Sequence, residues 1–184
     1  IRYEDKLRSF RGFVARKDLL DQYGLEEPET IDEWYKVLTV FKQNGIQAPL
    51  SYQLETYEPL GGIISAYGIV PNFYVDQGEV KYGYLEDEMK TALQTLAKWY
   101  AEGLLDQDIV SAGTNLDANV MNSKIAITYT TSGGGMGKYL KATNGGDETF
   151  DLVGLKLPVL NKGDQPEFSA STFPVTYDNN GFIT

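Results

Sequence analysis

The chain has 184 residues, a formal net charge of −10 and 42% hydrophobic residues, which predicts one folded domain and excludes a disordered chain. The negative charge argues against nucleic acid and anionic lipid as partners, because both present phosphates that attract a basic protein face. Cysteine and histidine are absent, which excludes disulfide bonds, zinc sites of the usual Cys/His type and Ser–His or Cys–His nucleophilic catalysis. No metal or cofactor is expected.

A short strand and a short helix are predicted at the start of the chain. Residues Phe13–Ala15 are β-prone and can enter a sheet before the first helix. The segment Arg16–Tyr23 is predicted to form that helix. Gly24 is expected to end it, because glycine adopts the left-handed conformation of a helix stop without steric cost.

A second helix is predicted after Pro28. Thr30 and Glu33 have the spacing of a capping box, in which each side chain accepts a hydrogen bond from the backbone N–H of the other residue. Apolar residues then recur at helical spacing on one face: Ile31, Trp34, Val37, Leu38 and Phe41. Gly45 stands where the helix stop is needed. On these residues alone, a helical hairpin that only packs a core explains the segment.

The segment Arg16–Gly45 also resembles a signature of bacterial extracellular solute-binding proteins of the carbohydrate-transporter type (family 1). The similar residues are Arg-Lys-Asp-Leu-Leu-Asp, then Tyr-Gly-Leu, and then Thr-Ile-Asp-Glu-Trp after Pro28. The resemblance covers most of the chain and is specific mainly here and at Lys90–Asp108. Members of this family are two-lobed receptors that hold a ligand between their lobes and deliver sugars to ABC importers.

The middle of the chain predicts an edge strand, a helix and a hairpin. Ala48–Tyr52 contains a proline, so it is expected to be an edge strand at best. Pro59–Tyr67 can form a helix, although two glycines weaken that prediction. Phe73–Tyr84 has two aromatic and β-branched runs around the turn Asp76-Gln77-Gly78, which predicts a surface hairpin.

The clearest helix is predicted over Glu86–Glu102. Acidic residues open it, where they suit the positive end of the helix dipole. One apolar face is expected from Met89, Leu93, Leu96, Ala97 and Tyr100. Gly103 is the expected stop, after which Leu104 can pack back onto Trp99.

The remaining elements alternate between helix and strand. Helices are predicted over Asn115–Ser123 and Lys138–Thr143, and strands over Ile125–Thr130 and Phe150–Leu157. This alternation predicts an α/β fold in which helices pack on a small mixed β-sheet. The resemblance implies one lobe of a periplasmic-binding-protein-like fold.

Residues 1–184 are expected to form a single domain. The resemblance implies that this domain is the inserted second lobe of a two-lobed solute-binding protein, with both termini at the hinge. A naturally short, independent protein is the alternative. The isolated lobe is expected to be a monomer.

The glycine-rich segment Thr131–Gly135 is the first candidate binding site. It follows a predicted strand and precedes a helix, and ligands of open α/β sheets bind at such strand ends. It lacks the Gly-Lys-Ser/Thr of a phosphate-binding loop. Hydroxyls of a neutral sugar need donors and acceptors such as Thr131, Ser132 and the backbone at Gly133. A flexible connector explains the segment as well.

Tyrosines are the second group of candidates. The chain has 13 of them, and several fall in predicted loops: Tyr52, Tyr57, Tyr67 and Tyr129. A tyrosine ring packs against the apolar face of a sugar while its hydroxyl serves the edge. Each of these tyrosines is also explained by ordinary packing.

The resemblance implies a binding protein and not an enzyme. The expected partners are a small solute, most simply a sugar or oligosaccharide, and the permease of an ABC transporter in a longer protein. The expected location of the full-length protein is extracellular, membrane-anchored as a lipoprotein, or periplasmic. Two alternatives stay open: a carbohydrate-active enzyme with a carboxylate pair, such as Asp106 with Asp108 or Glu55 with Asp117, and a non-catalytic interaction domain.

Overall fold

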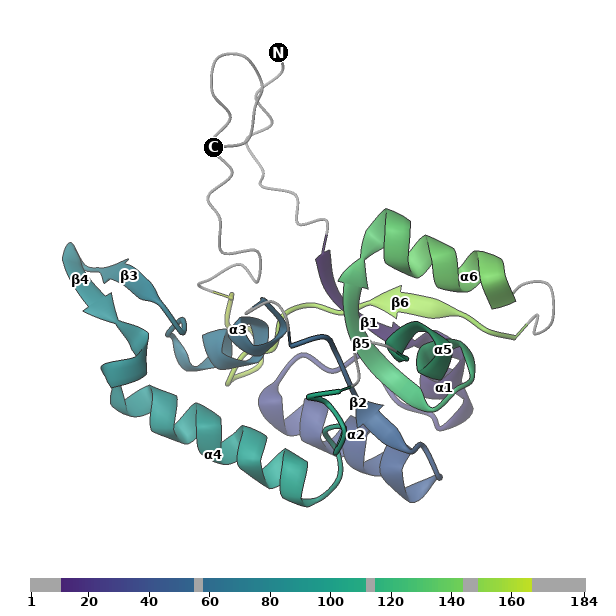
Figure 1. Ribbon diagram of the computed structural model, residues 1–184. Helices are drawn as coiled ribbons and strands as arrows, with labels where there is room; N and C mark the ends of the chain where they lie inside the picture. The colour runs from purple at the N-terminus through teal and green to yellow at the C-terminus, as the bar shows by residue number, and fades with distance from the viewer. Residues whose placement is uncertain (1–10, 55–57, 112–114, 144–148, 167–184) are drawn as a thin grey trace, which may run out of the picture.

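Figure 1 shows a computed structural model of the chain, which describes residues 11–54, 58–111, 115–143 and 149–166. A four-stranded sheet carries helices on both faces, and a two-stranded hairpin projects from one end. The sheet strands are β1 (Arg11–Arg16), β2 (Ala48–Leu50), β5 (Ile125–Thr131) and β6 (Leu152–Gly154). The predicted α/β fold with a small mixed sheet is confirmed.

The order of the strands places the end of β5 next to the start of β1. The order is β2-β5-β1-β6, with β2 parallel to β5 and β1 antiparallel to both β5 and β6. The carboxyl end of β5 lies where β1 begins, and Arg11 pairs with Thr131 there. β2 points the same way but ends earlier, beside Ile127. The strand at Ala48 was expected to be an edge strand, and this is confirmed because β2 is the outermost strand on one side of the sheet.

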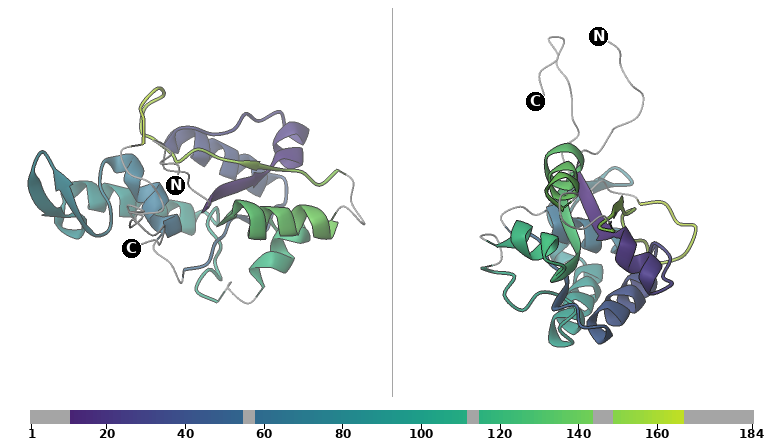
Figure 2. Two further views of the ribbon diagram at one scale, coloured as in Figure 1. Left: turned by 90° about the horizontal axis from the view of Figure 1, so that it is seen from above. Right: turned by 90° about the vertical axis from the view of Figure 1, so that its right-hand side faces the viewer.

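Buried side chains form one cluster on each face of the sheet, because side chains alternate along a strand. In β1, Phe13 and Ala15 belong to the larger cluster and Val14 to the smaller one. The larger cluster is covered by α1 (Lys17–Gln22), α2 (Ile31–Gln43), α3 (Glu58–Ile64) and α4 (Asp87–Ala101). The smaller one is covered by α5 (Leu116–Met121) and α6 (Gly137–Thr143). Figure 2 shows α1 and α2 on one side of the sheet and α5 and α6 on the other.

Helix α2 forms as its sequence predicts. The Thr30 hydroxyl accepts from the Glu33 N–H at 3.2 Å, and the Glu33 carboxylate accepts from the Thr30 N–H at 3.0 Å. The five residues of the predicted apolar face are all buried. Gly45 follows the helix with a φ of +89°, which is the conformation that favours glycine.

The inward face of α4 differs from the prediction. Its buried residues are Met89, Ala92, Leu96 and Trp99, whereas the predicted Leu93, Ala97 and Tyr100 are exposed, Leu93 by 48% and Tyr100 by 42%. Burying the larger Trp99 ring turns Tyr100 to the surface, where its hydroxyl donates to the Gln107 carbonyl at 3.1 Å. The predicted stop is confirmed, since the Leu104 N–H donates to the Trp99 carbonyl at 2.8 Å and Gly103 has a φ of +68°.

The predicted hairpin is formed by β3 (Phe73–Asp76) and β4 (Glu79–Tyr82), followed by the 3₁₀ turn η2 (Gly83–Leu85). Gln77 and Gly78 both have positive φ, the conformation of a tight hairpin turn. The base of the hairpin is tightly packed, because a methyl group on Gly83 would lie 1.8 Å from the Val70 carbonyl oxygen.

Two further predictions are adjusted by the structure. The helix expected over Pro59–Tyr67 is α3 continued by the 3₁₀ turn η1 (Ser65–Tyr67). The strand expected over Phe150–Leu157 is only three residues long, because β6 pairs with the last three residues of β1 alone. Phe150 lies instead under the buried Arg16 guanidinium, whose carbon is 4.1 Å from the ring centre.

Within the ranges given above, no helix is both long enough and apolar enough to cross a membrane. The same residues include no group of three or more Asp or Glu placed to hold a metal ion.

Candidate functional site

The candidate site lies at the carboxyl end of β5, where the chain turns from strand to helix. The turn η4 (Ser132–Met136) is a π-helical turn that runs directly into α6. The Thr131 hydroxyl accepts a hydrogen bond from the Gly135 N–H at 2.9 Å and so caps this turn. The predicted connector is therefore an ordered turn, because a side chain at the strand end satisfies its backbone.

Glycine is required at one position of η4 for a steric reason. A methyl group on Gly135 would lie 1.8 Å from the Thr130 hydroxyl oxygen. The neighbouring Gly133 has nothing within 4 Å of the place where its methyl group would be. Gly135 thus allows the turn to close onto β5, whereas Gly133 stands in open space.

The outer part of the turn is open to solvent. Ser132, Gly133 and Gly134 are exposed, and Thr131 is half-buried. The structure thus places three of the predicted site residues side by side at the carboxyl end of β5: Thr131, Ser132 and Gly133. A hydroxyl and closely approachable glycine backbone are the groups that can meet a polar ligand here.

Helix α6 is held next to α5 by a charged cluster below the turn. Asp117 of α5 pairs with the Lys138 ammonium and accepts from the Tyr139 hydroxyl at 2.7 Å. The hydrogen bond from Lys138 lowers the pKa of Asp117. Burial, followed by the hydrogen bond to Asp117, raises the pKa of Tyr139. This cluster fixes the helix that carries the candidate turn.

The tyrosines predicted for the site have different surroundings. Tyr129 is buried, with its ring centre 5.1 Å from that of Phe13 in an edge-to-face contact. Tyr52 is fully buried in the larger core cluster, and burial raises its pKa. Tyr57 lies outside the described residues. The structure groups the two buried tyrosines with the core below the sheet edge, and their contact with a ligand stays a prediction.

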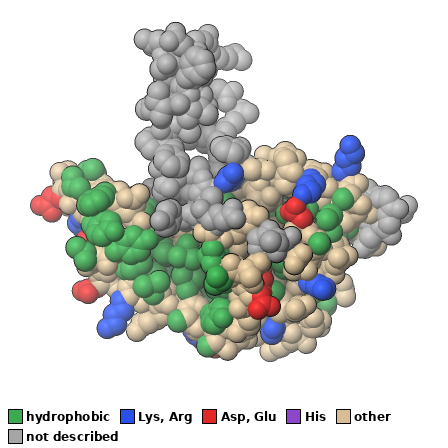
Figure 3. Space-filling view, in the orientation of Figure 1, with side chains coloured by type: hydrophobic (Ala, Val, Ile, Leu, Met, Phe, Trp, Pro, Cys, Tyr) green, Lys and Arg blue, Asp and Glu red, His purple; other side chains and the backbone are tan. Residues whose placement is uncertain are grey.

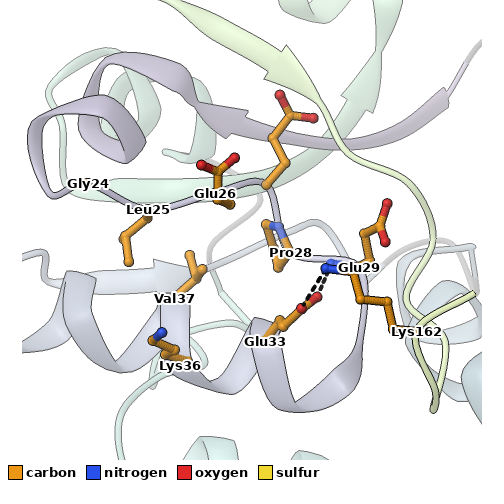
Figure 4. Close-up of a pocket in the computed structure, with 10 residues that line it drawn as sticks. Gly24, Leu25, Glu26, Pro28, Glu29, Glu33, Lys36, Val37 and Lys162 are labelled. Carbon is orange, nitrogen blue, oxygen red and sulfur yellow. Dashed lines mark hydrogen bonds and ion pairs between the residues drawn. The ribbon is translucent and has the colours of Figure 1, made fainter.

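A separate pocket of about 630 Å³ lies beside the start of α2. Figure 4 shows its acidic walls, which come from the α1–α2 connection and from α2. Two of its carboxylates have partners: Glu29 pairs with Lys156 at 2.7 Å, and Glu33 accepts from two backbone N–H groups and lies 3.6 Å from Lys162. The pocket includes none of the predicted site residues.

Two of the carboxylates considered for catalysis, Asp106 and Asp117, have structural partners. One Asp106 oxygen accepts from the Ser51 hydroxyl at 2.6 Å, and the other accepts from the Asp108 N–H at 3.0 Å. Asp117 belongs to the cluster with Lys138. Glu55 lies outside the described residues.

Sequence reasoning missed some of the residues that shape the site. Gly134 is as exposed as Gly133, and its position in the Gly-Gly-Gly run was an available signal. The contact of Gly135 with Thr130 and the pairing of Asp117 with Lys138 connect residues through the fold, so no local pattern announces them.

Comparisons with known proteins bear on this site. Lipoprotein LipO of Bacillus subtilis (strain 168) is 30% identical over 106 residues, which cover 52% of this chain and 21% of the lipoprotein. No family model matches the chain.

Several solved structures are similar over most of the chain. The alginate-binding protein AlgQ2 has a TM-score of 0.71 at 24% identity, covering 86% of this chain and 34% of its own. An HMO-binding, ABC-transporter-associated solute-binding protein of Bifidobacterium longum infantis has a TM-score of 0.68 at 22% identity, covering 86% and 35%. A sugar transporter of Bacillus licheniformis, solved with stachyose, has a TM-score of 0.62 at 21% identity, covering 85% and 41%.

The chain therefore has the fold of a part of solute-binding proteins of sugar ABC transporters, which confirms the resemblance indicated by Arg16–Gly45. It spans about a third of the length of the first two of these structures and about a fifth of the length of the lipoprotein.

Proposed function

We propose that this chain is one lobe of an extracellular, membrane-anchored or periplasmic receptor that binds a sugar or oligosaccharide for uptake by an ABC transporter. The structures with the same fold are described as binding proteins or transporters, and two of them were solved in complex with a sugar, stachyose or kestose. The chain spans about a third of two of them, which supports a partner lobe outside these residues. The proposed lobe is the inserted second one, joined to its partner at a hinge.

The observation that carries the proposal is the exposed turn at the carboxyl end of β5. Parallel strands of open α/β sheets present ligands at their carboxyl ends, and β5, which is parallel to β2, ends at this turn. The Ser132 hydroxyl can donate to and accept from a sugar hydroxyl, and Gly133 lets the ligand approach the backbone. The Thr131 hydroxyl still has its own proton to donate while it caps Gly135.

The proposed mechanism is closure of two lobes around the solute. A ligand that contacts both lobes binds the closed form better than the open form and shifts the population toward it. This lobe supplies one half of the contacts and performs no chemical step. The permease would then recognise the closed form.

The proposal is tested in the two-lobed protein by calorimetric titration with its sugar ligand. Ser132→Ala is expected to weaken affinity by roughly two- to tenfold, as for the loss of one hydrogen bond. Asn122→Ala is the matched control, since Asn122 is exposed at the opposite end of β5. Unchanged affinity in Ser132→Ala would contradict the placing of the binding site at η4, and turnover of the sugar would contradict the proposed function.

A further inference from the structure

The β3–β4 hairpin has its apolar face turned outward. Phe73 pairs with Tyr82 and Val75 with Val80, so these four side chains lie on one face of the ribbon. Phe73, Val75 and Val80 are 68%, 66% and 73% exposed. An ordinary ribbon would bury such a face and expose a polar one.

The opposite face of the ribbon carries its polar residues and meets the protein. Tyr74 packs against the larger core cluster, and Lys81 pairs with Asp76 at 2.7 Å. The hairpin cannot be turned over to hide its apolar face, because Tyr74 anchors the inner side. The outward apolar face is thus a fixed property of the fold.

Three aromatic rings form a continuous row on the outward side. The ring centre of Phe73 is 4.6 Å from that of Tyr82, which is 5.4 Å from that of Tyr84. Tyr84 is 46% exposed, and Leu85 beyond it is 82% exposed. We name Phe73, Tyr82, Tyr84 and Leu85, with Val75 and Val80, the hairpin strip. Figure 3 shows hydrophobic side chains gathered over this part of the molecule.

The base of the hairpin strip is anchored by backbone contacts. The Gly83 N–H donates to the Asn72 carbonyl at 3.0 Å, and the Phe73 N–H donates to the Asn72 side chain at 2.8 Å. Gly83 packs against the Val70 carbonyl with no room for a methyl group. A ligand would therefore meet a surface already in place, which reduces the entropy lost on binding.

Charge and size limit what can cover this strip. Residues 76–88 include five acidic residues and one basic residue, which disfavours an anionic partner such as a uronate chain or an acidic membrane. The strip has six side chains, whereas a stable protein interface uses about 20–30 residues on each side. A row of aromatic rings of this extent suits the C–H faces of neutral sugar rings.

We propose that the hairpin strip is a second carbohydrate-binding surface, outside the η4 turn, that stacks sugar rings of a neutral oligosaccharide on Phe73, Tyr82 and Tyr84. The inference takes its class of ligand from the function proposed above. The strip is complete within this chain, so it binds weakly without a partner lobe, whereas the η4 turn supplies only half of a site.

The test is an NMR titration of the 184-residue chain with neutral tetrasaccharides (stachyose, maltotetraose and cellotetraose) and with tetragalacturonate as the anionic comparison. At millimolar concentration, at least one neutral sugar is expected to shift the aromatic signals of the strip in a saturable way. The uronate is expected to bind more weakly. Absence of saturable shifts with every neutral sugar would overturn the proposal.

Variants separate ring stacking from general apolar contact. Phe73→Ala is expected to weaken the affinity for the neutral sugar by roughly three- to tenfold, because a stacked ring is lost. Val75→Ala should weaken it less. Tyr100→Ala is the control, since Tyr100 is an exposed aromatic residue of α4 outside the strip. Equal effects of Phe73→Ala and Tyr100→Ala would contradict the proposal.

Sedimentation of the chain tests whether a second copy of the chain, instead of a sugar, covers the hairpin strip. A dimer that Phe73→Ala converts to monomer would overturn the sugar proposal, and an unchanged monomer supports it. The two proposals fail separately. If the unmodified chain shows no saturable NMR shifts while the two-lobed protein still binds sugar, only the strip proposal is overturned. If Ser132→Ala leaves the affinity of the two-lobed protein unchanged, only the η4 site is overturned.

Discussion

Single residues decide the shape of the candidate turn and the packing below it. Gly135 closes η4 onto Thr130, while the Thr131 hydroxyl caps the same turn. Two buried tyrosines differ in their polar contacts: the Tyr139 hydroxyl donates to Asp117, and the Tyr52 hydroxyl has no partner among the described residues. A buried tyrosine hydroxyl lowers the stability of the folded protein when it is unpaired, as in Tyr52, but not when it is hydrogen-bonded, as in Tyr139.

Gly135→Ala should destabilise the chain by about 1–3 kcal/mol, as for overpacking of a filled site, because the new methyl group meets Thr130 at 1.8 Å. Gly133→Ala is the matched control, since its methyl group enters open space and should change stability by no more than about 0.5 kcal/mol. Urea unfolding followed by circular dichroism measures both. Equal stability of the two variants would show that η4 does not close onto β5 as described.

Tyr52→Phe should change the pH dependence of stability. Burial raises the pKa of Tyr52 above its usual value, so the neutral form is favoured in the folded protein. This contribution is complete below about pH 10, the ordinary tyrosine pKa, and is lost as the pH rises above it. At pH 7 the variant should be as stable as the parent or slightly more so, because an unpaired hydroxyl is removed.

The alkaline arm of a stability profile measures this effect. The parent should lose free energy of unfolding more steeply above pH 10 than Tyr52→Phe does. Identical alkaline slopes would mean that Tyr52 is exposed, contrary to its placement in the core.

At the scale of elements, two helices that face the larger cluster show which of their properties depend on nearby residues and which depend on distant ones. The start and end of α2 depend on Thr30, Glu33 and Gly45, which lie within or next to the helix. The orientation of α4 depends on which face meets the core, and there Trp99 displaced the predicted Tyr100. Helix ends are local properties, whereas helix rotation is decided by packing.

Thr30→Ala should lower the stability of the chain by about 1 kcal/mol, because the N–H of Glu33 loses its acceptor at a helix start. Thr39→Ala in the same helix is the control. The Thr39 hydroxyl only donates back to the Tyr35 carbonyl within the helix, so its removal should be close to neutral. Thermal unfolding monitored by circular dichroism compares them, and a Thr39→Ala loss as large as that of Thr30→Ala would contradict the cap.

This division explains how much could be predicted from the sequence. The capping box, the glycine stops, the hairpin turn and the strand–turn–helix at Thr131 were predictable, because each depends on residues a few positions apart. The short length of β6 and the burial of Tyr52 were not, because they depend on strands and helices brought together by the fold. For the same reason, the sequence placed Thr131, Ser132 and Gly133 together but could not assign a ligand contact to any tyrosine.

At the scale of the whole molecule, the η4 turn at the carboxyl end of β5 and the hairpin strip give the lobe two surfaces of different kinds. The turn offers a hydroxyl and glycine backbone, and we propose that a second lobe closes over it. The strip offers neighbouring aromatic rings, of which Phe73 and Tyr84 are exposed, and we propose that it binds a neutral sugar without a second lobe.

The central claim is that tight sugar binding needs both lobes. Isothermal titration of one neutral oligosaccharide into the 184-residue chain and into the two-lobed protein tests it most directly. We predict weak or undetectable heat with the chain alone and tight, saturable binding with the two-lobed protein. Binding by the chain alone that is as tight as binding by the two-lobed protein would contradict the claim.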